Sequence, residues 1–344
     1  MAAQNGYAVL REELKSGALR RAYIFYGEEA YLRDQLLRRV REALVPAGFE
    51  EFNYHKLSGK GLTVNDLQEV IEAMPMMAPA TLTVVEDMDL FRLDEFQRGR
   101  LMELLADIPE YATVIFVYDT LEYKRDGKMK KLCAALSAHV LEVEFAQQDS
   151  RELTRWVQRH FAAAGHTIDS AVVDHLLFTC GSMMTNLAPE IQKIAAYAKQ
   201  EKITPQDIDA VADPILDARI FDMTNAVTAG DYNRAAAVLA DLLRMQEEPF
   251  ILLAAIGKEL RRIYTARMAL DAGKDRFWLK SLWNMRSDYP AKLLMQAAGR
   301  VDHAWCSAAV KKARVLDRRM KSQRNIDPAE ELKLFLMELA GDRP

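Results

Sequence analysis

The chain has 344 residues, of which 50% are hydrophobic and 28% are charged, and its formal net charge is −4. This length suits two or three compact domains. Its longest apolar runs fall far short of the roughly 18–20 residues that a membrane-spanning helix needs, and the N-terminus lacks the pattern of a secretory signal. The three cysteines (Cys133, Cys180 and Cys306) are far apart and odd in number, which argues against a disulfide framework. These features predict a soluble cytoplasmic protein that makes no membrane contact.

The first part of the chain is predicted to alternate strands and helices. Apolar runs of buried-strand length occupy residues 22–26, 81–86, 113–118 and 141–145. Helices are expected up to residue 44 and over residues 64–73, 96–106 and 128–137. Because apolar strands alternate with helices, we expect a mostly parallel sheet that is covered on both faces.

From Asp149 onward the sequence predicts helices only, and an N-cap at residues 149–150 opens the first of them. We expect helices at residues 151–164, 170–179, 187–199, 205–211, 220–229, 233–245, 249–271, around 278–283, at 290–320 and at 328–340. Residues 212–214 (Ala-Asp-Pro) form an expected linker. The expected architecture is an α/β domain over 1–147, a small helical domain over 148–213 and a larger all-helical domain over 214–344.

Charge is distributed unevenly along the chain. Residues 256–325 contain 17 Lys and Arg against 6 Asp and Glu, so the rest of the chain carries an excess of negative charge. A basic segment of this kind can face a phosphate backbone or an acidic partner. The same cations can also be the solvated faces of amphipathic helices. The sequence leaves both interpretations open.

An α/β domain followed by a small helical domain invites a search for a nucleotide site. A phosphate-binding loop needs Gly-Lys-Ser/Thr after the first strand, but residues 27–29 (Gly-Glu-Glu) put two carboxylates there. Residues 58–61 (Ser-Gly-Lys-Gly) contain a Gly-Lys pair without that spacing. Glu86 and Asp87 resemble the acidic end of a Walker B strand, but without a phosphate loop we interpret them as an inherited strand end. We expect no ATP hydrolysis and no bound cofactor.

Other catalytic or metal-binding patterns are not apparent. The six histidines (residues 55, 139, 160, 166, 175 and 303) show no zinc-ligand spacing, and none lies beside a cysteine in a ligand pattern. There is no Gly-x-Ser-x-Gly motif, and no cysteine has a recognisable activating motif. The sequence therefore predicts neither catalytic nor metal-binding residues.

The segment before the second predicted strand is rich in methionine. Residues 73–80 contain three methionines, Met74, Met76 and Met77, together with Pro75 and Pro79. Methionine is adaptable and suits an apolar pocket on a partner. Alternatively, the three side chains close a corner of the domain's own core. Composition alone favours the second interpretation.

Three stretches together resemble the bacterial DNA polymerase III delta subunit family. The first is Tyr-Gly-Glu-Glu at 26–29 with Tyr-Leu at 31–32, followed by MPMMAPATLTVVED at 74–87. The second is GSMMTNLAPEIQKIAAYA at 181–198, and the third runs over 220–264 and includes Gly-Asp at 230–231 and Glu-Pro at 248–249. The resemblance extends in the right order from about residue 20 to residue 340.

This resemblance implies an AAA+-like fold whose phosphate loop has been lost. It implies a non-catalytic delta subunit of the clamp loader, within the DNA polymerase III holoenzyme, that favours the open form of the sliding clamp so that the clamp can be loaded on primed DNA. The family's clamp-binding wedge matches Met76 and Met77, framed by Pro75 and Pro79, where the family more often has a Leu–Phe type pair. With the resemblance included, the wedge becomes the favoured interpretation of the methionines.

The resemblance also implies partners and a location. The chain would join the ATPase subunits gamma/tau and delta-prime in a hetero-pentamer, reach primed DNA through that complex, and lie in the cytoplasm near the nucleoid. The family's C-terminal domain joins a pentameric collar, and the contacts of this chain in that collar would fall at Phe221, Pro249, Leu253 and Arg261. Two alternatives remain: a nucleic-acid-binding AAA+-like helical protein without a clamp partner, and an independent ATPase of the same superfamily.

Overall fold

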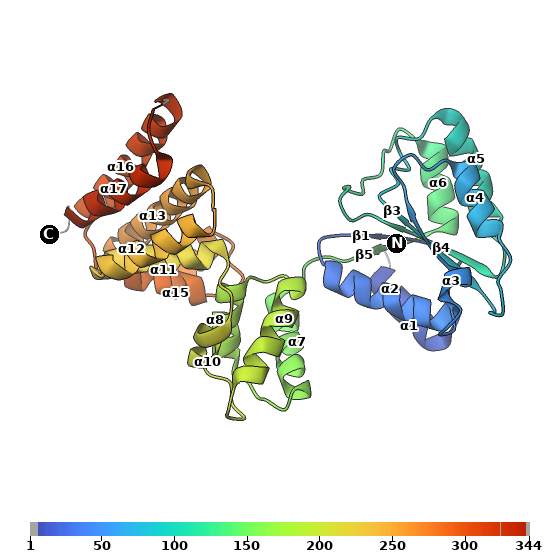
Figure 1. Ribbon diagram of the computed structural model, residues 1–344, viewed down its shortest axis with the longest axis horizontal. Helices are drawn as coiled ribbons and strands as arrows, with labels where there is room; N and C mark the ends of the chain where they lie inside the picture. Colours follow the sequence, from blue (N-terminus) through green and yellow to red (C-terminus); the bar gives the residue numbers. More distant parts are fainter. Residues whose placement is uncertain (1–5, 324, 342–344) are drawn as a thin grey trace. The chain divides into compact units, whose positions relative to one another are not determined.

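The computed structural model describes residues 6–323 and 325–341. The chain divides into two compact units (Figure 1). The first comprises Met1–Gln148 with Met183–Thr185, and the second comprises Asp149–Ser182 with Asn186–Pro344. A further division of the second unit into domains 148–213 and 214–344 stays a prediction.

The first unit is a sheet between two layers of helices. Its strands are β1 (Ala22–Tyr26), β2 (Tyr54–Ser58), β3 (Thr81–Glu86), β4 (Ala112–Val117) and β5 (Leu141–Glu144). All neighbouring strands pair in parallel, in the order β2-β3-β4-β1-β5. β1, β3 and β4 are buried along almost their whole length, because helices cover both faces of the sheet. The expected parallel sheet is confirmed.

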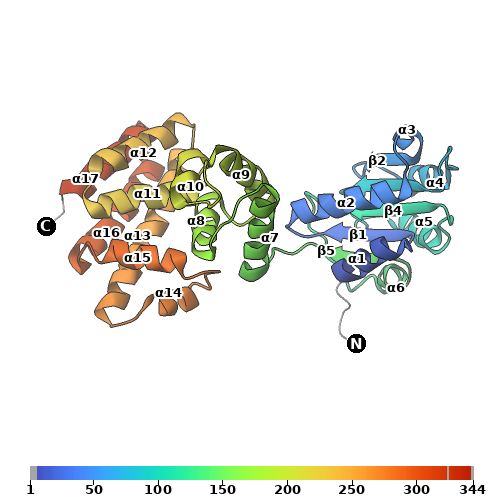
Figure 2. The same cartoon turned by 90° about the horizontal axis from the view of Figure 1, so that it is seen from below.

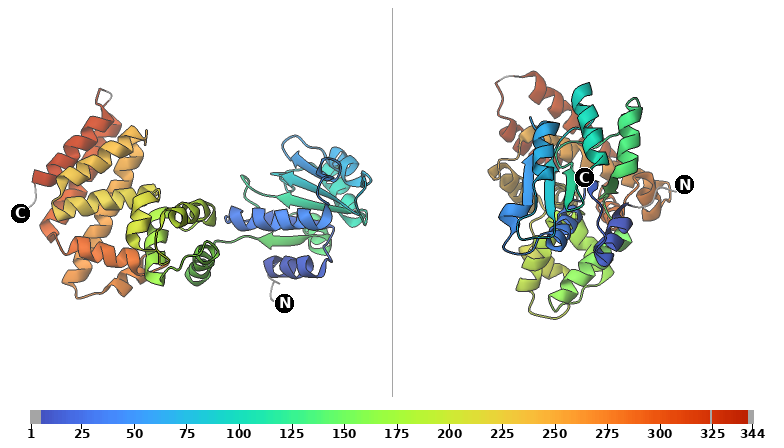
Figure 3. Two further views of the ribbon diagram at one scale, coloured as in Figure 1. Left: turned by 60° about the horizontal axis from the view of Figure 1, so that its bottom comes forward. Right: turned by 90° about the vertical axis from the view of Figure 1, so that its right-hand side faces the viewer.

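The helices of this unit form the two outer layers. They are α1 (Gly6–Ser16), α2 (Ala30–Leu44), α3 (Glu50–Asn53), α4 (Val64–Glu72), α5 (Glu95–Ala106) and α6 (Lys130–His139). α1 and α2 lie side by side on one face, and α4, α5 and α6 cover the other (Figures 1 and 3). α4 buries Val64, Leu67 and Ile71, which share one helical face, and Thr63 closes its N-terminus in a capping box with Asp66.

The second unit is almost entirely helical (Figure 2). Its helices are α7 (Ser150–Ala163), α8 (Ser170–Cys180), α9 (Met184–Tyr197), α10 (Pro205–Val211), α11 (Leu216–Ala229), α12 (Tyr232–Arg244), α13 (Pro249–Asp271), α14 (Arg276–Leu282), α15 (Tyr289–Ala298), α16 (His303–Ser322) and α17 (Pro328–Gly341). The largest apolar core of this unit is built by α11 to α17 around the long helix α13. Within the described residues, no helix is both long and apolar enough to cross a bilayer.

Most predicted elements are found within a few residues of their expected bounds, but four differences remain. The half-exposed edge strand β2 was missed because its residues (Tyr-His-Lys-Leu-Ser) carry no apolar run. α1 and the single-turn α3 were also missed. The helix expected over 290–320 is two helices, because Asp302 caps a new one by accepting a hydrogen bond from the backbone N–H of Trp305.

Candidate functional site

The methionine segment between α4 and β3 is an exposed loop. The exposed fractions of Met74, Met76 and Met77 are 78%, 54% and 82%, whereas Met88, just beyond β3, is buried. The three side chains therefore do not close a corner of the core. Several exposed apolar side chains in one short loop are typical of an interaction site rather than of an ordinary surface.

Both ends of this loop are held by one residue. The hydroxyl of Tyr111 donates a hydrogen bond of 2.8 Å to the carbonyl of Glu72, the last residue of α4. The backbone N–H of Thr81, the first residue of β3, donates one of 2.8 Å to the carbonyl of Tyr111. The base of the loop is thereby fixed. Tyr111 could not be singled out from the sequence, because it lies 39 residues along the chain from Glu72.

The tip of the loop contains a strained residue. Among the described residues, four that are not glycine have a positive φ: Met77, Asp87, Gln246 and Asn284. Met77 has a φ of 52°, and this left-handed conformation costs an L-residue roughly 1–2 kcal/mol. Such strain persists where the surrounding structure enforces it, and it is concentrated at functional sites.

A second region lies at the carboxyl edge of the sheet, where ligands of open α/β folds usually bind. The turn from β1 to α2 packs directly on Phe145. Gly27 has a φ of 115°, and a Cβ atom there would lie 2.6 Å from the Phe145 carbonyl oxygen. That oxygen accepts a 2.8 Å hydrogen bond from the N–H of Glu29. Glu29 is buried, and its carboxylate accepts a hydrogen bond from the N–H of Met184, which belongs to the same unit. The turn thus places a buried carboxylate where a phosphate-binding loop would present N–H groups.

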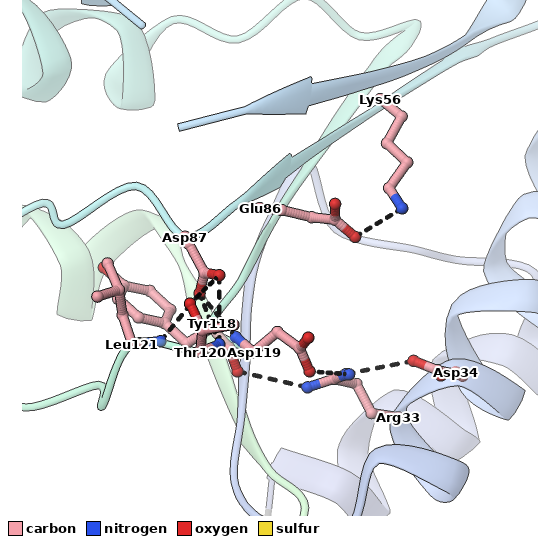
Figure 4. Close-up of polar contacts among 9 residues, drawn as sticks. All are labelled: Arg33, Asp34, Lys56, Glu86, Asp87, Tyr118, Asp119, Thr120 and Leu121. Carbon is pink, nitrogen blue, oxygen red and sulfur yellow. Dashed lines mark hydrogen bonds and ion pairs between the residues drawn. The ribbon is translucent and has the colours of Figure 1, made fainter. Parts of the chain in front are cut away.

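Asp87, directly after β3, binds the loop that follows β4 (Figure 4). Its carboxylate accepts hydrogen bonds from the N–H groups of Asp119, Thr120 and Leu121 at 2.9–3.1 Å and from the Thr120 hydroxyl at 2.6 Å. Partial burial by itself would raise the pKa of Asp87. These hydrogen bonds outweigh it and hold the pKa below its ordinary value. Both carboxylate oxygens are engaged within the chain, which supports the interpretation of Asp87 as a strand end.

The neighbouring charges are also paired within the chain (Figure 4). The buried guanidinium of Arg33 lies 2.5 Å from the carboxylate of Asp119 and 3.3 Å from that of Asp34. Lys56 on β2 lies 2.7 Å from Glu86. Among the described residues, no group of three or more His, Cys, Asp or Glu side chains could hold a metal ion.

Within residues 58–61, the glycine at position 59 is required by packing. A Cβ atom at Gly59 would lie 2.4 Å from the Cα atom of Met88, so only glycine allows this approach. The N–H of Gly59 donates a 2.6 Å hydrogen bond to the carbonyl of Glu86. The glycine of the Gly-Lys pair is therefore explained by the contact between the ends of β2 and β3.

The cysteines are free. Burial raises the pKa of Cys180 to about 12 and that of Cys306 to about 11. Both are therefore neutral thiols at physiological pH, and a neutral thiol is a poor nucleophile.

The expected collar residues lie in different environments. Phe221 and Leu253 are buried in the core of the second unit. Pro249 occupies the first turn of α13, and Arg261 lies exposed on the same helix. The side chains of Phe250 and Ile251, which the sequence analysis did not single out, are exposed beside Pro249.

A parallel sheet with this strand order, followed by helices, agrees with the AAA+-like fold expected from the sequence. Two family models match it: "DNA polymerase III, delta subunit" over residues 23–144 and "DNA polymerase III delta subunit, C-terminal domain" over residues 217–339. Together they cover more than two thirds of the chain. The chain belongs to the DNA polymerase III delta subunit family.

Individual relatives agree with this family. The DNA polymerase III subunit delta of Bacillus subtilis is 24% identical over 336 residues, which are 95% of each chain. A probable subunit delta of Aquifex aeolicus is 21% identical over 267 residues, 74% of this chain and 73% of that one. The solved structure of the Bacillus subtilis DNA clamp loader delta protein covers 97% of this chain and 99% of its own, with a TM-score of 0.56 and 22% identity. The expected fold class is confirmed.

Proposed function

We propose that this delta subunit binds the sliding clamp through the exposed loop at residues 73–80, with Met76 and Met77 as the apolar wedge between Pro75 and Pro79. The observation that carries the proposal is the exposure of these side chains on a loop whose base is fixed. Fully burying one methionine side chain in a partner's pocket is worth about 1.5–3 kcal/mol. A pair of them is therefore enough to anchor an interface.

In this proposal the clamp opens because the wedge binds its open form more tightly than its closed form. A wedge that fits the open form of the clamp better than the closed form shifts the population toward the open form. The chain performs no chemistry in this step. The size of the shift is limited by the difference in affinity for the two forms.

ATP binding and hydrolysis belong, in this proposal, to the gamma/tau subunits. At the carboxyl edge of the sheet, the charged groups of Arg33, Asp87 and Glu29 are engaged within the chain. This supports assigning the ATP chemistry to other subunits. The complex, a hetero-pentamer with delta-prime, acts in the cytoplasm. The helices that carry Phe221, Pro249, Leu253 and Arg261 would form its collar, and the exposed Phe250 and Ile251 offer apolar surface for a neighbouring subunit.

Contact with primed DNA is supported by one face of α16. Lys311, Arg314 and Arg318 are exposed and follow one another at helical spacing on this face. Cations arranged in this way neutralise phosphates, and such binding weakens steeply as salt is added. The same observation carries the second candidate function, a nucleic-acid-binding protein without a clamp partner.

The test is the binding of the full chain to its cognate sliding clamp without nucleotide. We expect Met76→Ala/Met77→Ala to weaken binding about 100-fold, a change of about 3 kcal/mol. Met245→Ala/Met337→Ala is the matched control, because it removes two exposed methionines of the second unit. Equal binding by wild type and the wedge variant would contradict the proposed site. Absence of clamp binding by wild type, together with salt-sensitive DNA binding, would favour the second function.

A further inference from the structure

A buried amide fixes the middle of the methionine loop. Asn53, the last residue of α3, is fully buried. Its Nδ2 group donates a 2.9 Å hydrogen bond to the carbonyl of Met76, and its Oδ1 atom accepts a 2.8 Å hydrogen bond from the N–H of Met76. The same Nδ2 group donates a second hydrogen bond, also of 2.9 Å, to the carbonyl of Phe49. The side chain therefore binds both polar groups of one residue in the loop.

This pairing requires an amide. Asparagine presents a donor and an acceptor side by side, as a neighbouring β-strand would. A carboxylate of the same size keeps the acceptor but places a second oxygen against the carbonyl of Met76. Alanine removes both partners. Only the amide therefore satisfies the N–H and the carbonyl of Met76 together.

The attachment of Met76 acts together with that of the loop's ends. Tyr111 holds Glu72 and Thr81, and Asn53 holds Met76 between them. With Met76 tied down, the chain reaches β3 through the left-handed conformation of Met77. The main chain is fixed while the methionine side chains stay exposed. A loop ordered before binding loses less conformational entropy when it enters a pocket.

We propose that Asn53 is the positioning residue of the clamp-binding loop, and that its amide sets the affinity for the clamp by holding the loop in its binding conformation in the free protein. This inference rests on the proposed function of Met76 and Met77. Asn53 itself need not touch the clamp. Its removal lowers the fraction of molecules that are ready to bind, and the apparent dissociation constant rises by the same factor.

The experiment measures clamp affinity and amide hydrogen exchange on the full chain. We expect Asn53→Ala to weaken clamp binding about tenfold, chiefly through slower association, and to speed exchange at the N–H of Met76. Asn53→Asp conserves the side-chain volume, and we expect it to weaken binding at least as much. The matched control is Gln97→Ala, which removes a 2.7 Å hydrogen bond from the Val64 N–H to a side chain of the same unit. It should lower thermal stability and leave clamp affinity unchanged.

A double-mutant cycle separates this inference from the proposed function. In the Met76→Ala/Met77→Ala background, Asn53→Ala should cause no further loss. If the wedge variant loses binding but both Asn53 variants bind like wild type, the positioning role is wrong and the wedge stands. An undiminished Asn53 effect in the wedge background also overturns the inference, because Asn53 would then act elsewhere. If the wedge variant binds like wild type, the proposed site and the inference both fail.

Discussion

The segments before and after β3 each contain a residue with a positive φ, but only one of these residues is stabilised by its own side chain. Met77, before the strand, and Asp87, after it, both have a positive φ, 52° and 54°. At Asp87 this strain is offset because its carboxylate accepts hydrogen bonds from the loop after β4. The Met77 side chain can make no such compensation and is 82% exposed. A region whose polar groups are already hydrogen-bonded within the chain leaves few of them for a ligand. A strained loop with exposed apolar side chains is instead suited to binding a partner.

The largest expected effect on the free energy of unfolding concerns the close packing at the carboxyl edge of the sheet. Gly27→Ala should destabilise the first unit by about 3–5 kcal/mol, because its Cβ atom would collide with the Phe145 carbonyl at a φ that alanine disfavours. Urea unfolding followed by circular dichroism measures the change. Gly61→Ala is the control: Gly61 also has a positive φ, but a Cβ atom there meets open space. Equal losses in the two variants would mean that backbone conformation, and not the close packing, accounts for the effect.

Removing the carboxylate of Asp87 should have the next largest effect. Asp87→Ala leaves the N–H groups of Asp119, Thr120 and Leu121 without their acceptor, and we expect a loss of about 2–3 kcal/mol in the free energy of unfolding. Asp87→Asn keeps one acceptor oxygen and tolerates the left-handed backbone, so it should lose less than half as much. A loss below about 0.5 kcal/mol for Asp87→Ala would show that these hydrogen bonds contribute little to stability.

The same carboxylate should make stability depend on pH in acid. The pKa of Asp87 in the folded chain lies below its ordinary value of about 3.9. Its contribution is therefore fully present above the ordinary pKa and is lost as pH falls through the lower folded value. We expect the difference in unfolding free energy between wild type and Asp87→Asn to be constant from pH 8 to 5 and to shrink toward pH 3. A difference that grew in acid would mean that the pKa is raised instead.

The smallest expected effect concerns the open loop. Met77→Ala should change the free energy of unfolding by less than about 0.5 kcal/mol, because the side chain is exposed. Met77→Gly should be more stable than Met77→Ala by about 1 kcal/mol, since glycine adopts a positive φ without strain. At Ala78, whose backbone is not left-handed, glycine should instead be the less stable residue. The same order of stabilities at both positions would remove the argument for strain at Met77.

The sequence predicted the buried strands better than the edge strand β2. β1 and β3 are runs of apolar and β-branched residues, so their bounds could be predicted to the residue. The half-exposed edge strand β2 shows no such run, because its solvent-facing residues are free to be polar.

The candidate site was only partly predictable. Composition alone favoured a core role for Met74, Met76 and Met77, and only the family resemblance reversed that interpretation. Asn53 and Tyr111 could not be found from the sequence, because each acts on backbone groups that lie 23 and 39 residues away. Contacts of this kind are set by tertiary structure and leave no local pattern.

The most direct measurement is amide hydrogen exchange of the full chain with the sliding clamp and, separately, with Mg-ATP. We expect the clamp to slow exchange in residues 74–80, and we expect Mg-ATP to change exchange at no amide in residues 27–33, 86–87 or 119–121. Protection by Mg-ATP at the carboxyl edge, or clamp protection that leaves residues 74–80 unchanged, would contradict it.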